Sequence, residues 1–101
     1  MFVTPLYYFG TSAQIKTVID RLYGIDYKLM GSGKRAILMA AAYDDRDWPM
    51  TDLVAHFRTI VKYLKWKEAG VLLATGCGTR RDIERTEYPE RAYQMGRGVG
   101  R

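Results

Sequence analysis

The sequence predicts an α/β fold built on a parallel sheet. Short apolar runs alternate along the chain with longer segments whose apolar residues recur every three or four positions. Glycine, proline and aspartate separate these segments. The chain has 101 residues, which is enough for one domain and too few for two. Each strand is therefore expected to be followed by a helix that returns the chain to a parallel neighbour.

Three apolar runs are predicted strands. The first covers residues 1–4 and ends at Pro5. The second covers residues 36–43, and the third covers residues 71–75, which precede a glycine-rich turn. Short runs without charge are typical of strands that are buried on both faces of a sheet.

Three amphipathic segments are predicted helices. The first can be capped by Thr11 or Ser12, and its periodic pattern stops at Gly24. The second has Pro49 near its first turn and Asp47 as its expected cap.

The third predicted helix begins at Thr86. Residues 96–101 have the sequence GRGVGR, and glycine is unfavourable inside a helix. This helix is therefore expected to extend little beyond residue 95.

Composition excludes several classes of protein. Apolar residues make up 48% of the chain and charged residues 27%, which is typical of globular proteins. The longest uncharged apolar run, residues 36–43, is far shorter than the roughly 20 residues that cross a bilayer. The N-terminus lacks the pattern of a secretory signal, and one cysteine cannot form an internal disulfide. No membrane association is expected, and the cytoplasm is the expected compartment.

The loop after the first strand is rich in aromatic residues. Tyr7, Tyr8 and Phe9 are consecutive and lie between Pro5 and Gly10. Ligands of an open parallel sheet bind at the carboxyl ends of the strands, where this loop lies. Three consecutive rings cannot all face a core. Either they form a platform on which a flat conjugated ligand stacks, or one or two rings pack beneath the helix while the others make a subunit contact.

The same region carries a Pro-x-Tyr loop, followed by a helix with Ile-Lys and Asp-Arg pairs. The residues in this pattern are Pro5, Tyr7, Ile15, Lys16, Asp20 and Arg21. With these residues the chain resembles the flavodoxin-like NAD(P)H-dependent FMN reductases and the related iron-sulfur flavoproteins. The resemblance continues through residues 33–45 and 70–96, so it covers almost the whole chain.

This resemblance implies a flavoprotein oxidoreductase that binds FMN and takes electrons from NADH or NADPH. The hydride transfer is the flavin's own chemistry, so no catalytic acid, base or nucleophile of the protein is expected. The loops after the three strands would border the flavin ring. The expected cofactor-binding residues are Pro5, Leu6, Tyr7, Tyr8, Phe9, Gly10, Ala42, Tyr43, Asp44, Gly76, Cys77 and Gly78.

The sequence departs from the family at its N-terminal end. Complete members begin with a strand, a phosphate-binding loop, a helix and a second strand, and residues 1–101 show no counterpart of these. The resemblance thus implies one partial domain, a flavodoxin-like three-layer sandwich truncated to three parallel strands, in the order 3-4-5, with three helices. Without the phosphate loop, FMN binding is expected to be weak or absent. The alternative function is a non-enzymatic half-domain that oligomerises.

Other possible sites are less favoured. Residues 31–34 resemble a P-loop, but Arg35 replaces the required Ser or Thr and a strand follows. Cys77 is interpreted as a small buried thiol, and one cysteine cannot hold an iron-sulfur cluster. His56 has no metal-binding companions in the sequence, so no metal site is expected.

Charge and topology suggest partners. The net charge is +5, but six arginines between residues 80 and 101 are interleaved with four acidic residues. This pattern favours the steering of anionic nucleotides over nucleic-acid binding.

The first strand would become an uncharged sheet edge, and such edges pair with other chains. A homo-oligomer is expected, most simply a two-fold dimer with residues 5–10 near the interface.

Overall fold

The computed structural model describes residues 1–99 and contains one parallel sheet. Its strands are β1 (Phe2–Pro5), β2 (Arg35–Ala41) and β3 (Lys67–Ala74), which lie in the order β1-β2-β3. This confirms the α/β class, the parallel strands and the edge position of the first strand. That these are the third to fifth strands of a longer sheet stays a prediction.

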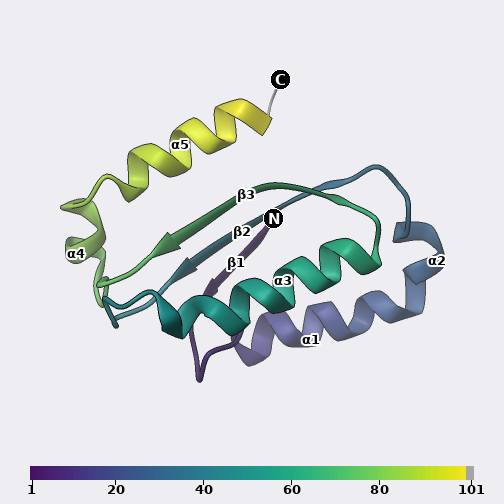
Figure 1. The fold of residues 1–101 in the computed structure, drawn as a ribbon, viewed down its shortest axis with the longest axis horizontal. Helices are drawn as coiled ribbons and strands as arrows, with labels where there is room; N and C mark the ends of the chain where they lie inside the picture. Colours follow the sequence, from purple (N-terminus) through teal and green to yellow (C-terminus); the bar gives the residue numbers. More distant parts are fainter. Residues whose placement is uncertain (100–101) are drawn as a thin grey trace.

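Helices cover the sheet on both faces. They are α1 (Ala13–Arg21), α2 (Asp26–Leu29), α3 (Thr51–Tyr63), α4 (Arg80–Glu84) and α5 (Tyr88–Val99), with 3-10 turns at Leu22–Ile25 and Trp48–Met50. Figure 1 shows α1 and α3 on one side of the strands and α5 on the other. The arrangement has three layers, and the short helices α2 and α4 are additions to the three predicted helices.

The core lies between the central strand and α3. Leu38, Met50 and Leu53 are almost fully buried there. Phe2 reaches the same core from β1 and meets Phe57 edge to face, with 6.0 Å between ring centroids. Alternate residues of β2 are buried against α3, so the residues between them face the opposite layer.

The first two predicted helices differ from the structure in their ends. Ser12 caps α1 as expected, because its hydroxyl accepts a hydrogen bond from the Ile15 amide at 3.4 Å. The expectation that Gly24 ends the helical segment is wrong, since the chain continues through a 3-10 turn into α2. Asp47 precedes the 3-10 turn before α3, but its side chain makes no capping hydrogen bond.

The third predicted helix is longer than expected. The prediction that the C-terminal glycines limit it is wrong, because α5 continues to Val99. The Arg35 guanidinium donates a hydrogen bond to the Val99 carbonyl at 2.7 Å. Met95 lies so close to Gly70 on β3 that a Cβ there would be 2.8 Å from the methionine sulfur. These tertiary contacts outweigh the low helix propensity of glycine. Among residues 1–99, no helix has the length and apolar character that a membrane span requires.

Candidate functional site

The three loops that follow the strands meet at one edge of the sheet. Backbone hydrogen bonds connect them: the Leu6 amide donates to the Ala41 carbonyl at 2.9 Å, and the Gly76 amide donates to the Asp44 carbonyl at 3.0 Å. All the expected cofactor-binding residues lie in these loops or at the strand ends that lead into them. The parallel topology therefore brings the predicted set to the same side of the molecule.

The first loop forms a tight two-residue turn made of aromatic side chains. Tyr7 and Gly10 exchange two backbone hydrogen bonds of 3.1 Å, and the residues between them have positive φ angles, 46° at Tyr8 and 67° at Phe9. Turns with two successive positive φ angles strongly prefer Asn, Asp or Gly. Left-handed backbone costs other residues about 1 kcal/mol or more each. The turn is thus locally strained.

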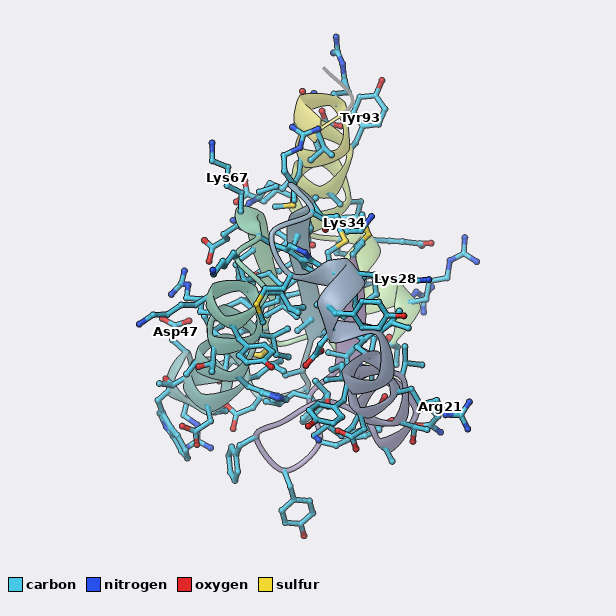
Figure 2. The ribbon with its side chains drawn as sticks, turned by 90° about the vertical axis from the view of Figure 1, so that its right-hand side faces the viewer. Arg21, Lys28, Lys34, Asp47, Lys67 and Tyr93 are labelled. Carbon is cyan, nitrogen blue, oxygen red and sulfur yellow. The ribbon has the colours of Figure 1, made fainter. Side chains whose placement is uncertain are left out.

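This aromatic turn (residues 7–10) projects its rings away from the core. Tyr8 is 99% exposed and Tyr7 is 60% exposed. Figure 2 shows side chains of this purple loop extending from the end of the molecule. Tyr7 and Tyr8 therefore do not pack beneath α1, and a subunit contact through these exposed rings stays a prediction.

The remaining ring of the turn is held by the second loop. Phe9 stacks on Trp48, with 5.7 Å between centroids and 24° between ring planes. The guanidinium of Arg46 lies over the same indole, 5.0 Å from its centroid. Sequence analysis did not select Trp48 or Arg46 as site residues, although an aromatic residue in a loop after a buried strand was a usable signal.

Arg46 is fixed in turn by Asp44. The Asp44 carboxylate accepts hydrogen bonds of 2.9 Å from the Arg46 Nε and from the Arg46 backbone amide. These bonds lower the pKa of Asp44 from its ordinary 3.8 to about 2, and they raise the pKa of Arg46. Both groups are ionised near neutral pH, so the guanidinium keeps its place over the indole.

Tyr43 lies against the third loop. A Cβ on Gly78 would be 2.5 Å from Cδ2 of Tyr43, so only glycine allows the ring this position. The amides of Gly78 and Thr79 both donate to the Asp82 carboxylate at 3.0 Å, which lowers the pKa of Asp82. Tyr43 itself is 84% exposed.

An open hollow of about 570 Å³ separates the second and third loops. It is lined by Tyr43, Asp44, Asp45, Arg46, Gly76 and Asp82. Three of these residues are carboxylates, and the single guanidinium is already paired. The hollow is polar and mainly acidic, which is unfavourable for a phosphate group.

Cys77 lies in the third loop, between Gly76 and Gly78. Its side chain is buried, and the thiol donates a weak hydrogen bond to the Thr75 carbonyl at 3.4 Å. This agrees with its interpretation as a small buried thiol. In residues 1–99, no group of three or more His, Cys, Asp or Glu side chains forms a metal-binding cluster.

Comparison with known proteins gives information on the fold. No family model and no curated protein matches the sequence. Among solved structures, the fold is similar to "The Structure of Trp Repressor Binding Protein from Bacillus subtilis", with a TM-score of 0.77 and 23% sequence identity. The match covers 94% of this chain and 68% of that one. The arrangement of strands and helices described above is therefore one that a solved protein also adopts.

Proposed function

We propose that the carboxyl edge of the sheet binds the ring system of FMN, and that the chain serves NAD(P)H-dependent oxidoreduction there. The strained aromatic turn carries this proposal. Backbone strain at bulky residues persists where it serves a site, because an unstrained Asn-Gly turn would be more stable. Here the strain holds the Tyr8 ring entirely in solvent.

The described residues fit an isoalloxazine ring. Tyr7, Tyr8 and Tyr43 present large exposed ring surfaces on two of the three loops, and planar aromatic systems stack favourably on such rings. The backbone amides of Tyr8 and Phe9 donate to no acceptor within residues 1–99. Both can therefore donate to carbonyl oxygens of a ring that lies on the turn.

The described residues do not fit a phosphate group in the same way. Asp44, Asp45 and Asp82 surround the neighbouring hollow, and Arg46 is already engaged. The glycine-rich third loop does open α4 at this edge, but two of its backbone amides already donate to the Asp82 carboxylate and are not free for a phosphate. Binding is accordingly proposed to depend on the ring and not on the phosphate.

When bound, the flavin would supply the exchange of hydride with a nicotinamide. The chain's own contribution is to bind and orient. Phe9 and Trp48 connect the first and second loops, Tyr43 lies on Gly78, and the ring platform shields one side of a ligand from water. The resemblance to FMN reductases described above supports the same assignment.

A titration tests this proposal. Flavin fluorescence is followed while the protein is added to FMN and, separately, to riboflavin, which lacks the phosphate. We expect quenching, with dissociation constants of the two flavins that agree within about threefold. Tyr8→Ala is expected to weaken both about tenfold, which corresponds to about 1.4 kcal/mol. Absence of quenching at millimolar concentration would overturn the proposal.

Tyr27→Ala is the matched control. Tyr27 is 77% exposed and lies on α2, at the opposite end of the molecule in Figure 1. The Tyr27→Ala variant should bind FMN and riboflavin with unchanged dissociation constants. Oxidation of NADPH in the presence of FMN, measured for the same three proteins, then tests whether bound flavin is reduced: a rate that falls with Tyr8→Ala alone supports the oxidoreductase assignment.

A further inference from the structure

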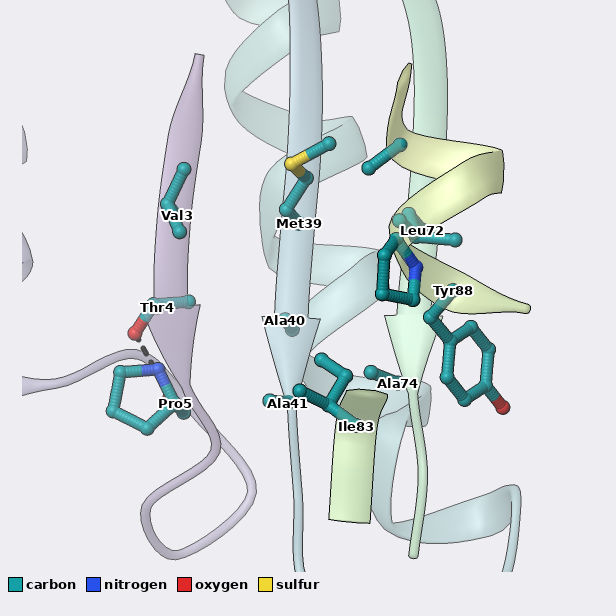
Figure 3. Close-up of a pocket in the computed structure, with 12 residues that line it drawn as sticks. Val3, Thr4, Pro5, Met39, Ala40, Ala41, Leu72, Ala74, Ile83 and Tyr88 are labelled. Carbon is teal, nitrogen blue, oxygen red and sulfur yellow. Dashed lines mark hydrogen bonds between the residues drawn. The ribbon is translucent and has the colours of Figure 1, made fainter. Parts of the chain in front are cut away.

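Charged side chains are distributed unevenly over the molecule. An apolar hollow of about 400 Å³ lies on the face opposite α1 and α3, and no charged residue lines it (Figure 3). The carboxyl edge of the sheet holds the mainly acidic hollow described above. At the opposite end, where β2 and β3 begin, basic side chains gather. Figure 2 views the molecule from this end and shows Lys28, Lys34 and Lys67 there.

These basic side chains come from two segments that are distant in the sequence. Residues 27–35 and residues 61–67 each contain three basic residues and no acidic residue. The six basic residues, which we call the basic edge, are Lys28, Lys34, Arg35, Lys62, Lys65 and Lys67. The rest of the chain has ten basic and eleven acidic residues, so the net charge of +5 comes entirely from these two segments.

The fold holds the two segments side by side. The Lys67 amide donates a hydrogen bond to the Lys34 carbonyl at 3.0 Å. The indole of Trp66 donates to the Leu29 carbonyl at 2.8 Å. All six basic residues of the edge are exposed. The basic edge is therefore formed by the tertiary structure, and it is not visible as one cluster in the sequence.

The arrangement brings like charges close together. Arg35 is opposite Lys67 in the pairing of β2 with β3, and neighbouring strands lie about 4.8 Å apart, so the two charges repel each other. Within residues 1–99, the six basic side chains form no ion pair with a carboxylate. The adjacent Glu68 is already paired with Arg58 at 2.8 Å. An anionic partner would relieve this repulsion.

We propose that the basic edge binds the phosphate backbone of a single-stranded nucleic acid. Proteins that bind single strands combine a basic surface, which follows the backbone, with aromatic rings on which the bases stack. A stripe of basic residues on one part of the surface is typical of nucleic-acid binding. Residues 80–101, whose charges do not favour such binding, take no part in it.

Tyrosine rings accompany the lysines. Tyr63 belongs to the second segment and is 54% exposed. Its hydroxyl donates to the Asp26 carboxylate at 2.9 Å, which fixes the ring at this end of the molecule. That hydrogen bond raises the pKa of Tyr63, and the nearby Tyr23, which is 80% exposed, contributes to the same shift. The Tyr63 hydroxyl is therefore neutral and does not repel a phosphate.

An anionic membrane fits this surface less well. Segments that lie on a membrane bury an apolar face among the headgroups and acyl chains. In the second segment the aliphatic residue between Lys62 and Lys65, Leu64, is 2% exposed and belongs to the interior of the protein. The exposed ring beside it is a tyrosine. Stacking on bases uses this ring without requiring an apolar row.

Fluorescence anisotropy tests the proposal. The unmodified chain is titrated into a labelled oligothymidylate of about 20 nucleotides, over a range of salt concentrations. The logarithm of the affinity should fall linearly with the logarithm of the salt concentration, with a slope of about −0.7 for each phosphate contact. Lys34→Gln together with Lys67→Gln should weaken binding about tenfold or more and reduce the slope by about 1.4.

Arg81→Gln together with Arg85→Gln is the matched control. It changes the net charge by the same amount, and both arginines are exposed on or next to α4, at the carboxyl edge. It should leave the affinity and the slope almost unchanged. Circular dichroism checks that both double variants are folded. Absence of binding at low salt, or an equal loss in the control, would overturn the proposal.

The ring separates a single strand from other anionic partners. Tyr63→Ala should weaken binding about tenfold, whereas Tyr63→Phe, which keeps the ring, should bind as the unmodified chain does. A duplex of the same length should bind more weakly than the single strand. Equal binding of the duplex, or no effect of Tyr63→Ala, would contradict base stacking. Binding to phosphatidylserine vesicles without binding to the oligonucleotide would assign the basic edge to a membrane and overturn the proposal.

Discussion

The rings of Phe9 and Trp48 lie nearly parallel, 5.7 Å apart between centroids, although Phe9 follows β1 and Trp48 follows β2. The stack connects two loops that approach each other only because the strands are parallel neighbours. It also holds one end of the strained turn, which is the surface proposed to bind flavin.

Removing this stack should loosen the turn without unfolding the protein. We expect Phe9→Leu to destabilise the fold by less than about 1 kcal/mol, because both rings are exposed to solvent. The near-ultraviolet circular dichroism of the tryptophan should fall in the same variant. The control is Trp48→Phe, in which Phe9→Leu should produce no further spectral change. An equal change in both backgrounds would show that the stack is not formed.

Relaxing the turn should separate stability from binding. Replacement of Tyr8 by Asn together with Phe9→Gly places the preferred residues at the two positive φ positions. We expect a gain in stability of about 1 kcal/mol or more, measured by urea unfolding. Flavin quenching should be lost in the same protein. A variant that is less stable, or one that binds flavin as before, would contradict the functional origin of the strain.

The Asp44–Arg46 pair should give a defined dependence on pH. The pKa of Asp44 in the folded protein is about 2, below its ordinary 3.8. A lowered carboxyl pKa stabilises the fold above the unfolded value, and this contribution is lost as the pH falls towards the folded value. The difference in melting temperature between the unmodified protein and Asp44→Asn should thus be constant above about pH 5 and should disappear towards pH 2.

Arg46→Gln tests the origin of that dependence. It removes the side-chain hydrogen bonds that lower the pKa of Asp44 but keeps the bond from the Arg46 backbone amide, so its profile should have the same shape as that of Asp44→Asn and a smaller size. The double variant should add nothing further, because both changes break one interaction. Additive effects of the two substitutions would contradict the pairing.

Two glycines should respond in opposite ways to substitution by alanine. At Gly70 a Cβ would lie 2.8 Å from the Met95 sulfur, so Gly70→Ala should force the Met95 side chain out of its rotamer and cost about 0.5–1.5 kcal/mol. At Gly24 a Cβ would meet nothing within 4 Å, so Gly24→Ala should be neutral or should stabilise by about 0.4–1 kcal/mol. Urea unfolding measures both changes. Equal effects would show that Met95 does not pack on Gly70.

Local patterns in the sequence predicted several elements correctly. Periodic apolar residues identified α1 and α3, and Ser12 was one of two predicted caps, because a capping side chain acts on the next turn of the same helix. The length of α5 was not predictable in this way, since Val99 and Met95 are held by Arg35 and by β3. Those contacts join distant parts of the chain.

The candidate site was predicted only in part, for a related reason. The expected loops do meet, because the carboxyl ends of parallel strands share one edge of the sheet. The positive φ angles of Tyr8 and Phe9 could not be expected, since propensity argues against them at large side chains. Trp48 has no periodic context, and its partner Phe9 lies in another loop.

The register of the sheet has a kinetic consequence. Phe2 is opposite Leu38 and Leu38 is opposite Val71, so each pair of neighbouring strands joins residues that are more than thirty positions apart in the sequence. Closing such long loops costs chain entropy before any pairing is gained, which slows folding in proteins of high contact order. The four-residue edge strand β1 has one neighbour, whereas β2 has two. In hydrogen exchange, the amides of β1 should therefore exchange first and those of β2 last.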